Sequence, residues 1–355
     1  MTPTLVRQHA SHADSAPRVD LCARARDWSE IQERMLVPLY EAVHERLEVG
    51  PATRLLGLRC GSGLALLLAA GRGAAVTGVD TASPERLALA RARLLPDTLR
   101  ANTGSGIPGG HGSPGGSSGA PGAHDPRGRA DGIPGGHGRR CEGGDVPDAH
   151  GARAGGGAPA GPGPRDGRSR PRARAAVRLL DGSPRDVADA ETAAYTLVTV
   201  FEPIGCLAGD SEGLDELLAD ALPRAARGAA VVLAGWGPPE RCATSSVLRV
   251  ATKLADPLRS ARSWRPARRD DLEEVAQRAG LKPDGSGRVA CPFGYADTDS
   301  AVRGLLSTGL FDAAIAATDA KQVDKELAEA LHPHRRPDGT VWMPNVFRYL
   351  VARVP

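Results

Sequence analysis

The sequence predicts an α/β fold in which helices cover both faces of a mostly parallel β-sheet. Three observations predict it. Short apolar segments alternate with helical segments along the 355-residue chain, and this alternation is typical of parallel strands joined by helices. A glycine-containing turn, Gly61-Ser62-Gly63, joins the first such strand to the next helix, and Asp80 directly follows the second strand. Open α/β sheets bind their ligands beyond strand ends of this kind.

The elements before residue 98 follow from local patterns. A helix is predicted over residues 28–47, because apolar residues recur every four positions along one face. Pro38 predicts a kink or a break within this helix. Ser83 suits an N-cap and Pro84 a first helical position, which predicts a helix that continues to Leu95. Strands are predicted at 54–58 and 74–79, with a helix at 64–70 between them.

The same alternation resumes after residue 174. Helices are predicted at 214–226, 270–280 and 313–331. The last strand is expected in or near the interior of the sheet. The strands predicted in this half of the chain are 176–180, 195–201, 229–234, 286–291 and 347–354.

One domain over residues 28–355 is predicted, preceded by a disordered tail over 1–27 and interrupted by a disordered insert over 98–174. The insert is rich in glycine and proline and contains no aromatic residue, so it cannot bury enough apolar surface to offset the entropy cost of ordering. It carries a 13-residue repeat with His111, His124, His137 and His150. These histidines could bind a metal weakly, but a tolerated coding repeat is favoured, because flexible ligands lose much entropy on converging. No metal site is predicted.

Composition and charge exclude several classes of partner. The net charge is only +3, and no Lys/Arg block is interleaved with aromatic residues, so nucleic acid is not expected as a partner. The six cysteines are scattered without a C-x-x-C pair, which favours reduced thiols in the cytoplasm. Neither a secretory signal nor an apolar run of roughly 18 to 20 residues is found, so no membrane association is expected.

The turn and the acidic residue after the second strand together indicate a nucleotide-type ligand. The glycines let the backbone approach a ligand closely, and the helix that follows offers unpaired N–H groups. Asp80 can accept two hydrogen bonds from a ribose diol. The alternative is an ordinary tight turn, with Asp80 exposed at a strand end.

Several segments resemble motifs of the class I S-adenosylmethionine (SAM) methyltransferases. L-L-G-L-R-C-G-S-G, residues 55–63, resembles V-L-D-L-G-C-G-T-G, and V-T-G-V-D, residues 76–80, resembles the second motif. Segments 180–182, 195–199, 229–236 and 345–352 resemble later motifs, so the similarity runs from about 28 to 354 apart from the insert. It implies a Rossmann-like, doubly wound, seven-stranded sheet with an antiparallel last strand, and SAM as the cofactor.

The resemblance also implies roles for individual residues. Gly61, Ser62 and Gly63 would line the methionine part of SAM, and Asp80 would bind its ribose. Asp181 could serve equally as a cap or turn residue. The other implied cofactor contacts are Asp181 and Gly182 at the adenine and Phe201 beside the cofactor. Cys60 is expected to be a small apolar spacer.

Three positions depart from the family pattern: Gly57 replaces an acidic residue, Arg59 the first glycine, and Thr196 an aspartate of the fourth strand. The family's acid at position 57 helps to hold the ammonium end of the cofactor. Arg59 could pair with the cofactor carboxylate, since a guanidinium binds one bidentately. Alternatively, Arg59 points to solvent and the altered turn weakens cofactor binding.

The resulting prediction is a methyltransferase that uses SAM and acts on an O-, N- or C-nucleophile of a small molecule. Transfer from a sulfonium depends mainly on proximity and orientation, so no catalytic residue is assigned. His44 and Glu202 are candidate general bases. The N-terminal helix and segment 236–264 are candidate lids over the acceptor. Candidate wall residues are Trp28, Tyr40, Trp236, Trp264 and Tyr295.

Two other functions are weighed against this one. A catalytically degenerate protein of the same fold, with a regulatory or interaction role, is suggested by the three departures. An NAD(P)-dependent oxidoreductase is disfavoured, because no further glycine follows the G-x-G turn three residues later. The oligomeric state does not follow from the sequence.

Overall fold

The structure is a computed structural model that describes residues 20–95, 176–186, 194–206, 210–255 and 271–355. The insert predicted over 98–174, with its histidine repeat, lies outside the described residues. So do residues 1–19 of the predicted tail, and Trp264.

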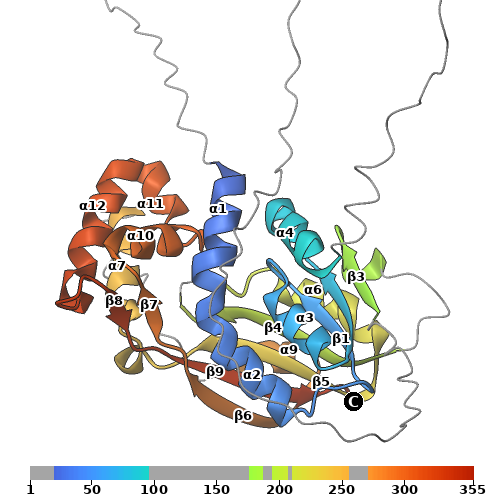
Figure 1. The fold of residues 1–355 in the computed structure, drawn as a ribbon. Coiled ribbons are helices and arrows are strands. Elements are labelled where there is room, and N and C mark those ends of the chain that lie inside the picture. Colours follow the sequence, from blue (N-terminus) through green and yellow to red (C-terminus); the bar gives the residue numbers. More distant parts are fainter. Residues whose placement is uncertain (1–19, 96–175, 187–193, 207–209, 256–270) are drawn as a thin grey trace, which may run out of the picture. The chain divides into compact units, whose positions relative to one another are not determined.

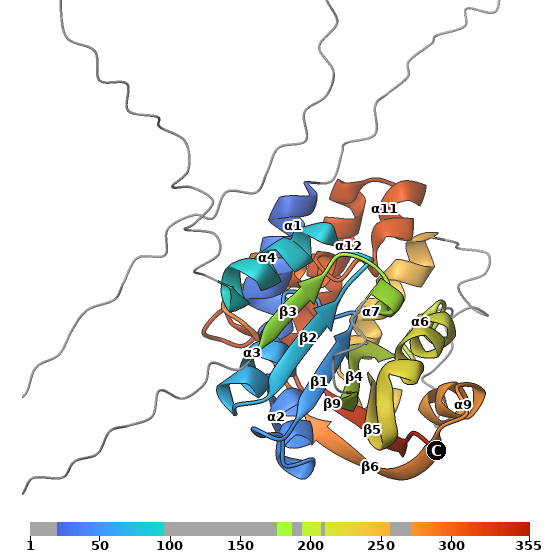
Figure 2. The same cartoon turned by 90° about the vertical axis from the view of Figure 1, so that its right-hand side faces the viewer.

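The core of the fold is a seven-stranded sheet in the order β3-β2-β1-β4-β5-β9-β6, seen with its near edge toward the viewer in Figure 2. The inner strands are rich in Val, Leu, Ile or Ala where they cross the core, as strands buried on both faces must be, whereas the edge strand β6 is polar and largely exposed. The strands are β1 (Arg54–Leu58), β2 (Ala75–Val79), β3 (Val177–Leu180), β4 (Tyr195–Ile204), β5 (Ala225–Trp236), β6 (Lys282–Ala290) and β9 (Val346–Arg353).

Strand directions match the prediction. β1 pairs in parallel with β2 and β4, β2 with β3, and β4 with β5. β9 lies between β5 and β6 and is antiparallel to both, which confirms the predicted antiparallel last strand and its interior position. The chain runs outward from β1 to β3 and then returns to β4 on the other side of β1. The carboxyl ends of β1 and β4 therefore form a topological switch point, where such sheets bind ligands.

Helices cover both faces of the sheet. On one face, α2 and α3 pack on inward-facing residues such as Leu55 and Val76. On the other face, α6 and α9 pack on residues such as Leu56 of β1 and Val198 of β4. The helices named in this description are α1 (Leu21–Asp27), α2 (Val37–Arg46), α3 (Leu64–Gly71), α4 (Pro84–Leu94), α6 (Leu214–Ala221), α7 (Thr244–Ala255), α9 (Asp271–Arg278), α10 (Thr298–Leu306), α11 (Asp312–Ala317) and α12 (Ala320–Leu331).

Beyond the sheet, α7 and α10–α12 gather with a two-stranded sheet of β7 (Phe293–Tyr295) and β8 (Val341–Met343), as Figure 1 shows on the left of the molecule. None of α7, α10, β7 and β8 was expected from the sequence. The helix predicted over 313–331 divides at Thr318, because Asp319 caps α12 by accepting a hydrogen bond from the Gln322 N–H at 2.8 Å.

The N-terminal helix begins earlier than predicted. The Asp20 side chain accepts hydrogen bonds from the N–H groups of Cys22 and Ala23 at 3.0 Å, so residues 21–27, assigned to the tail, form α1. A π-helical turn, Trp28–Gln32, and a 3₁₀ turn, Glu33–Leu36, connect α1 to α2. The predicted break occurs just before Pro38, in the first turn of α2, where a missing N–H is harmless.

Two further expectations need correction. The helix predicted over 214–226 ends at Ala221, because Pro223 turns the chain into a 3₁₀ turn and Ala225 already begins β5. Cys22 is disulfide-bonded, whereas all six thiols were expected to be reduced; Cys60, Cys206, Cys242 and Cys291 are free. Among the described residues, no helix has the length and apolar character that a bilayer crossing needs.

His44, a candidate general base, lies in the core on α2. Its side chain is completely buried, it meets the ring of Phe201 edge to face at 5.8 Å, and neither ring nitrogen has a hydrogen-bond partner. Burial lowers the pKa of His44 from 6.5 to about 4. The imidazole is therefore neutral at pH 7, and it is too deeply packed to act as a general base.

This burial predicts a pH-dependent stability. Between pH 6.5 and about 4 the unfolded chain protonates His44 and the folded chain does not. The contribution of neutral His44 to the free energy of unfolding is therefore complete above pH 6.5 and is lost as the pH falls toward 4. The loss approaches about 3 kcal/mol near pH 4. Urea unfolding of His44→Leu should show a much flatter decline over this range than wild type. His332→Leu, an exposed control, should keep the wild-type decline; an unchanged slope in His44→Leu would contradict the assignment.

Candidate functional site

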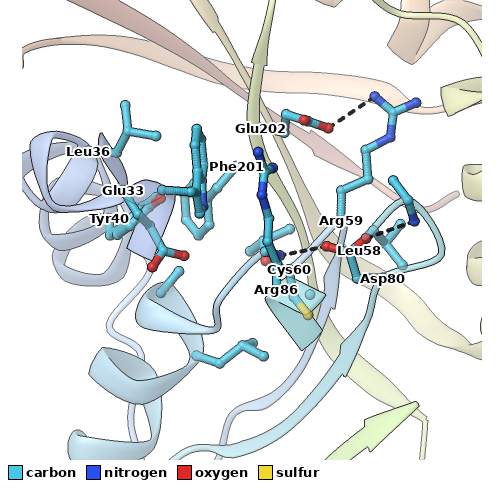
Figure 3. Close-up of a pocket in the computed structure, with 17 residues that line it drawn as sticks. Glu33, Leu36, Tyr40, Leu58, Arg59, Cys60, Asp80, Arg86, Phe201 and Glu202 are labelled. Atoms are coloured by element: carbon cyan, nitrogen blue, oxygen red, sulfur yellow. Dashed lines mark hydrogen bonds and ion pairs between the residues drawn. The ribbon is translucent and has the colours of Figure 1, made fainter. Parts of the chain in front are cut away.

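The candidate site lies at the switch point, where the turn after β1, the end of β2 and the middle of β4 meet the N-terminal helical segment. A cavity at this point is lined from all four. Figure 3 shows Leu36, Glu33 and Tyr40 of the N-terminal segment on one side of it, and Arg59 and Asp80 on the other. The site is therefore built from segments that the sequence places far apart.

The turn after β1 has a left-handed backbone at three of its five residues: Arg59 (φ 48°), Gly61 (φ 58°) and Gly63 (φ 78°). Glycine adopts this conformation without strain, whereas the Cβ of Arg59 makes it costly there. Gly57 is explained by packing, because a Cβ at this position would lie 2.8 Å from Cδ2 of Leu66 on α3. Of the departures from the family pattern, Gly57 thus avoids a clash with α3, whereas Arg59 adds backbone strain to the turn.

Asp80 holds this turn to the end of β2. Its side chain is 4% exposed and accepts hydrogen bonds from the N–H groups of Gly61 (2.8 Å), Ala82 (2.9 Å) and Ser83 (3.3 Å). The alternative of an exposed strand-end aspartate is therefore wrong. An ionised carboxylate offers about four acceptor positions, so Asp80 keeps room for one further donor rather than two.

The Arg59 side chain is held by other groups of the protein, and its predicted pairing with a cofactor carboxylate stays a prediction. Its guanidinium pairs with the Glu202 carboxylate at 3.3 Å, the dashed contact in Figure 3, and donates to the Glu212 carbonyl at 2.6 Å. It therefore does not point freely into solvent, although it lines the cavity. Instead, Arg59 ties the strained turn to the segment that follows β4.

Ser62 connects the turn to the N-terminal segment and does not line the cavity. Its hydroxyl is fully buried and donates to the Glu33 carboxylate. Arg93 of α4 completes this network, with an ion pair to Glu33 at 2.9 Å and donated hydrogen bonds to the Ser62 carbonyl (2.8 Å) and the Ser29 hydroxyl (2.7 Å). Sequence reasoning did not find Glu33, whose only signal was an acidic residue on the buried side of a helix.

Two large side chains narrow the cavity. The guanidinium of Arg86 lies 4.2 Å from the centre of the Trp28 ring and donates to the Ser307 carbonyl at 2.6 Å. Burial lowers the pKa of Arg86, and nearby Glu202 and Asp80 oppose this shift. The Trp28 indole N–H is buried without a partner. The space that remains is about 40 Å³, on the order of one water molecule.

A larger cavity of about 210 Å³ adjoins the first and shares Trp28, Leu36, Arg59 and Glu202 with it. Aromatic rings form much of its wall: Trp236 lies 4.6 Å from Phe347 and 5.9 Å from Phe293 between ring centres. Of the expected wall residues, Trp28 and Trp236 line this cavity and Tyr40 lines the first. Tyr295 lies in the core, where its hydroxyl donates to Gln32 at 2.9 Å.

The predicted cofactor contacts are only partly brought together. Those that line the first cavity are Arg59, Gly61, Asp80 and Phe201. Gly63 packs on α4, and Asp181 is exposed beside Gly182, which lies against Asp186; these three line neither cavity. Thr196 accepts a hydrogen bond from the Arg54 N–H at 3.0 Å, at the end of β4 away from the site.

Cys60 behaves as a packed apolar residue. Burial, with help from Asp80 and Glu33, raises the pKa of its thiol, so the thiolate nucleophile is disfavoured. Within the described ranges, no cluster of three or more His, Cys, Asp or Glu side chains has the arrangement of a metal site.

Comparison with known proteins gives matches in structure only. No protein-family model matches the chain, and no curated protein matches its sequence. A SAM-dependent methyltransferase from Thiobacillus denitrificans, in complex with S-adenosyl-L-homocysteine, is 13% identical over 95% of this chain and 99% of that chain, with a TM-score of 0.42. One from Geobacter sulfurreducens, in the same type of complex, is 14% identical over 91% and 92%, with a TM-score of 0.38. YjhP from Escherichia coli is 15% identical over 94% and 99%, with a TM-score of 0.41.

The packing of the turn predicts a sharp contrast between two glycines of one helix. A Cβ on Gly63 would lie 2.9 Å from the Ala90 Cβ, at φ 78°, whereas one on Gly71 would meet nothing within 4 Å. Gly63→Ala should therefore lower the free energy of unfolding by about 2 to 4 kcal/mol. Gly71→Ala should leave it unchanged or raise it by about 0.5 kcal/mol. Urea unfolding measures both, and equal values would contradict this packing.

Proposed function

We propose that the protein transfers a methyl group from SAM to a small-molecule acceptor. The observation that carries the proposal is the hydrogen bond of 2.8 Å between Asp80 and the Gly61 N–H. It places a buried carboxylate directly beside a left-handed turn at the switch point of the sheet, where a nucleoside and its charged substituent are expected to bind. The motif resemblance found in the sequence supports SAM over other nucleosides.

The residues of the site fit SAM in chemistry, and each has a definite task. Asp80 would accept one ribose hydroxyl in its remaining acceptor position. The turn over 59–63 would wrap the methionine part, and Phe201 would pack beside the nucleoside. Asp181 and Gly182 line neither cavity, so their contact with the adenine stays a prediction from the sequence. SAM supplies a methyl group on a sulfonium; the acceptor's lone pair forms the new bond to carbon, and the electrons of the broken carbon–sulfur bond stay on sulfur.

The first cavity must widen before SAM can bind in it. About 40 Å³ is too small for a nucleoside, so we infer that side chains that narrow the cavity, Trp28 and Arg86 among them, move when the ligand enters. The Trp28–Arg86 stack is suited to this role, because a guanidinium over an indole ring contributes only about 0.5 to 2 kcal/mol. Closure over the bound ligand would then exclude water from the reacting atoms.

The larger cavity is the proposed acceptor site. Its aromatic wall and volume of about 210 Å³ favour a flat, mainly apolar molecule. Glu202 lines both cavities and is 40% exposed at its side chain. One of its oxygens pairs with Arg59, and the other would accept the proton that an O–H or N–H acceptor loses.

Calorimetry with purified protein tests the proposal. S-adenosylhomocysteine (SAH) and SAM should bind wild type, and Asp80→Asn should weaken SAH at least about tenfold, because the ribose loses a charged acceptor. Asp297→Asn, at a helix N-cap far along the chain, is the matched control and should bind SAH as wild type does. No binding of either ligand to wild type at millimolar concentration would remove the proposal.

A regulatory protein of the same fold is the second candidate, favoured by the nearly filled cavity and by Arg59. A restored variant separates the two. Gly57→Asp is combined with Arg59→Gly and with Leu66→Ala, because the new Cβ would otherwise lie 2.8 Å from Leu66. If SAH binds only this variant, the natural protein is not a working methyltransferase. If SAH binds wild type, the proposal of a methyltransferase stands.

A further inference from the structure

Two polar atoms of the N-terminal segment converge on one glycine of the turn. A Cβ at Gly61 would lie 3.3 Å from the Trp28 Nε1 and 3.4 Å from the Glu33 Oε1. Both side chains line the first cavity. Even a Cβ at position 61 would be crowded here, so the indole N–H and the carboxylate both lie close to this glycine, which itself lines the cavity.

The Trp28 N–H is a donor without an acceptor. The residue is only 9% exposed, and its Nε1 is buried with no hydrogen-bond partner. A buried donor in this state costs roughly 1 to 3 kcal/mol. Trp28 also carries the cation of Arg86 on its ring, 4.2 Å from the ring centre, so a positive charge lies close to this donor as well as the Glu33 carboxylate.

The Glu33 carboxylate is an acceptor with one oxygen already committed. Its side chain is 3% exposed, and its Oε2 holds Arg93 at 2.9 Å and the Ser62 hydroxyl. The Oε1 has only a long contact of 3.4 Å with the Leu64 N–H. This oxygen is therefore available for a cation, while Arg93 keeps the charge of the carboxylate compensated in the absence of one.

An orphaned donor beside an available carboxylate oxygen is complementary to an α-amino acid, whose carboxylate and ammonium are separated by one carbon. We propose that Trp28 and Glu33 bind the amino-acid end of SAM, with the ligand carboxylate on the Trp28 N–H and its ammonium on the Glu33 Oε1. This inference rests on the proposed function. It explains how the site can lack an acid at Gly57, because Glu33 supplies the negative charge from a helix instead of from β1.

The irregular helix makes this placement possible. Trp28–Gln32 is π-helical and Glu33–Leu36 is 3₁₀, and short segments of this kind often mark functional sites. The change of pitch turns Ser29, Gln32 and Glu33 inward together, and all three are buried. Binding of the amino-acid end would thus be coupled to docking of this segment on the turn.

The proposal predicts a dependence on the amino-acid end of the ligand, which calorimetry can isolate. SAH carries that end, and 5′-methylthioadenosine has the same nucleoside and sulfur without it. Glu33→Gln and Trp28→Phe should each weaken SAH by about tenfold or more and change the affinity for methylthioadenosine less than twofold. Glu41→Gln, an exposed acid on α2, is the matched control and should change neither.

Folding of the variants is checked by thermal unfolding, since Glu33→Gln leaves Arg93 without its partner. Glu33→Gln combined with Arg93→Met removes both charges and should show the same selective loss of SAH. Equal weakening of both ligands, or no weakening of SAH, in the folded variants overturns the inference. If wild type binds neither ligand, the proposed function fails. If wild type binds both ligands and the variants weaken both equally, only the inference about Trp28 and Glu33 fails.

Discussion

The site depends on the buried carboxylate of Asp80. It accepts backbone hydrogen bonds from Gly61 on one side and from Ala82 and Ser83 on the other, so it fixes the turn after β1 against the turn after β2. Left-handed residues alone would not hold that shape, because a loop with so many accessible conformations gains entropy when released. The charge on Asp80 makes each of these bonds stronger than a neutral one. Asp80 thus joins the two turns that meet at the switch point, and the cavity lies beside this junction.

Around this fixed point, the chain compensates a strained residue with polar contacts. Arg59 occupies a left-handed conformation that costs roughly 1 to 2 kcal/mol in a residue with a Cβ. Its side chain is held by Glu202 and by the Glu212 carbonyl, and contacts of a partly exposed ion pair contribute about the same amount at most. The two terms are similar in size, so the turn is near balance rather than strongly stabilised. Such a turn can change conformation at low cost when a ligand displaces the Arg59–Glu202 pair.

Local patterns predicted the sheet well, because its signals lie within single segments. The strands that contain Leu55 and Val76 and the cap at Ser83 each depend on neighbours within a few residues, and all were found in the predicted places. The position of Glu33 could not be predicted, since it depends on a change of helical pitch and on Arg93 sixty residues later in the chain. The burial of His44 was missed for a similar reason: a helix that packs on β4 through Phe201 carries no mark of that partner in its own sequence. Charged and polar residues on the buried side of a helix were the least predictable part of the molecule.

The nearly closed first cavity and the polar N-terminal segment have one physical explanation. Glu33, Ser62, Arg93 and Ser29 satisfy one another through buried hydrogen bonds, so the segment can stay docked on the turn without a ligand, whereas an unpaired buried carboxylate would force it away. Beside this network the Trp28 N–H has no hydrogen-bond partner, the Glu33 Oε1 has only the long contact with the Leu64 N–H, and both lie near Gly61. The junction therefore presents a donor without a partner beside a weakly bonded acceptor. Under the proposed function, a ligand that completes both groups carries an acceptor and a donor close together, and it enters once Arg86 leaves the Trp28 ring.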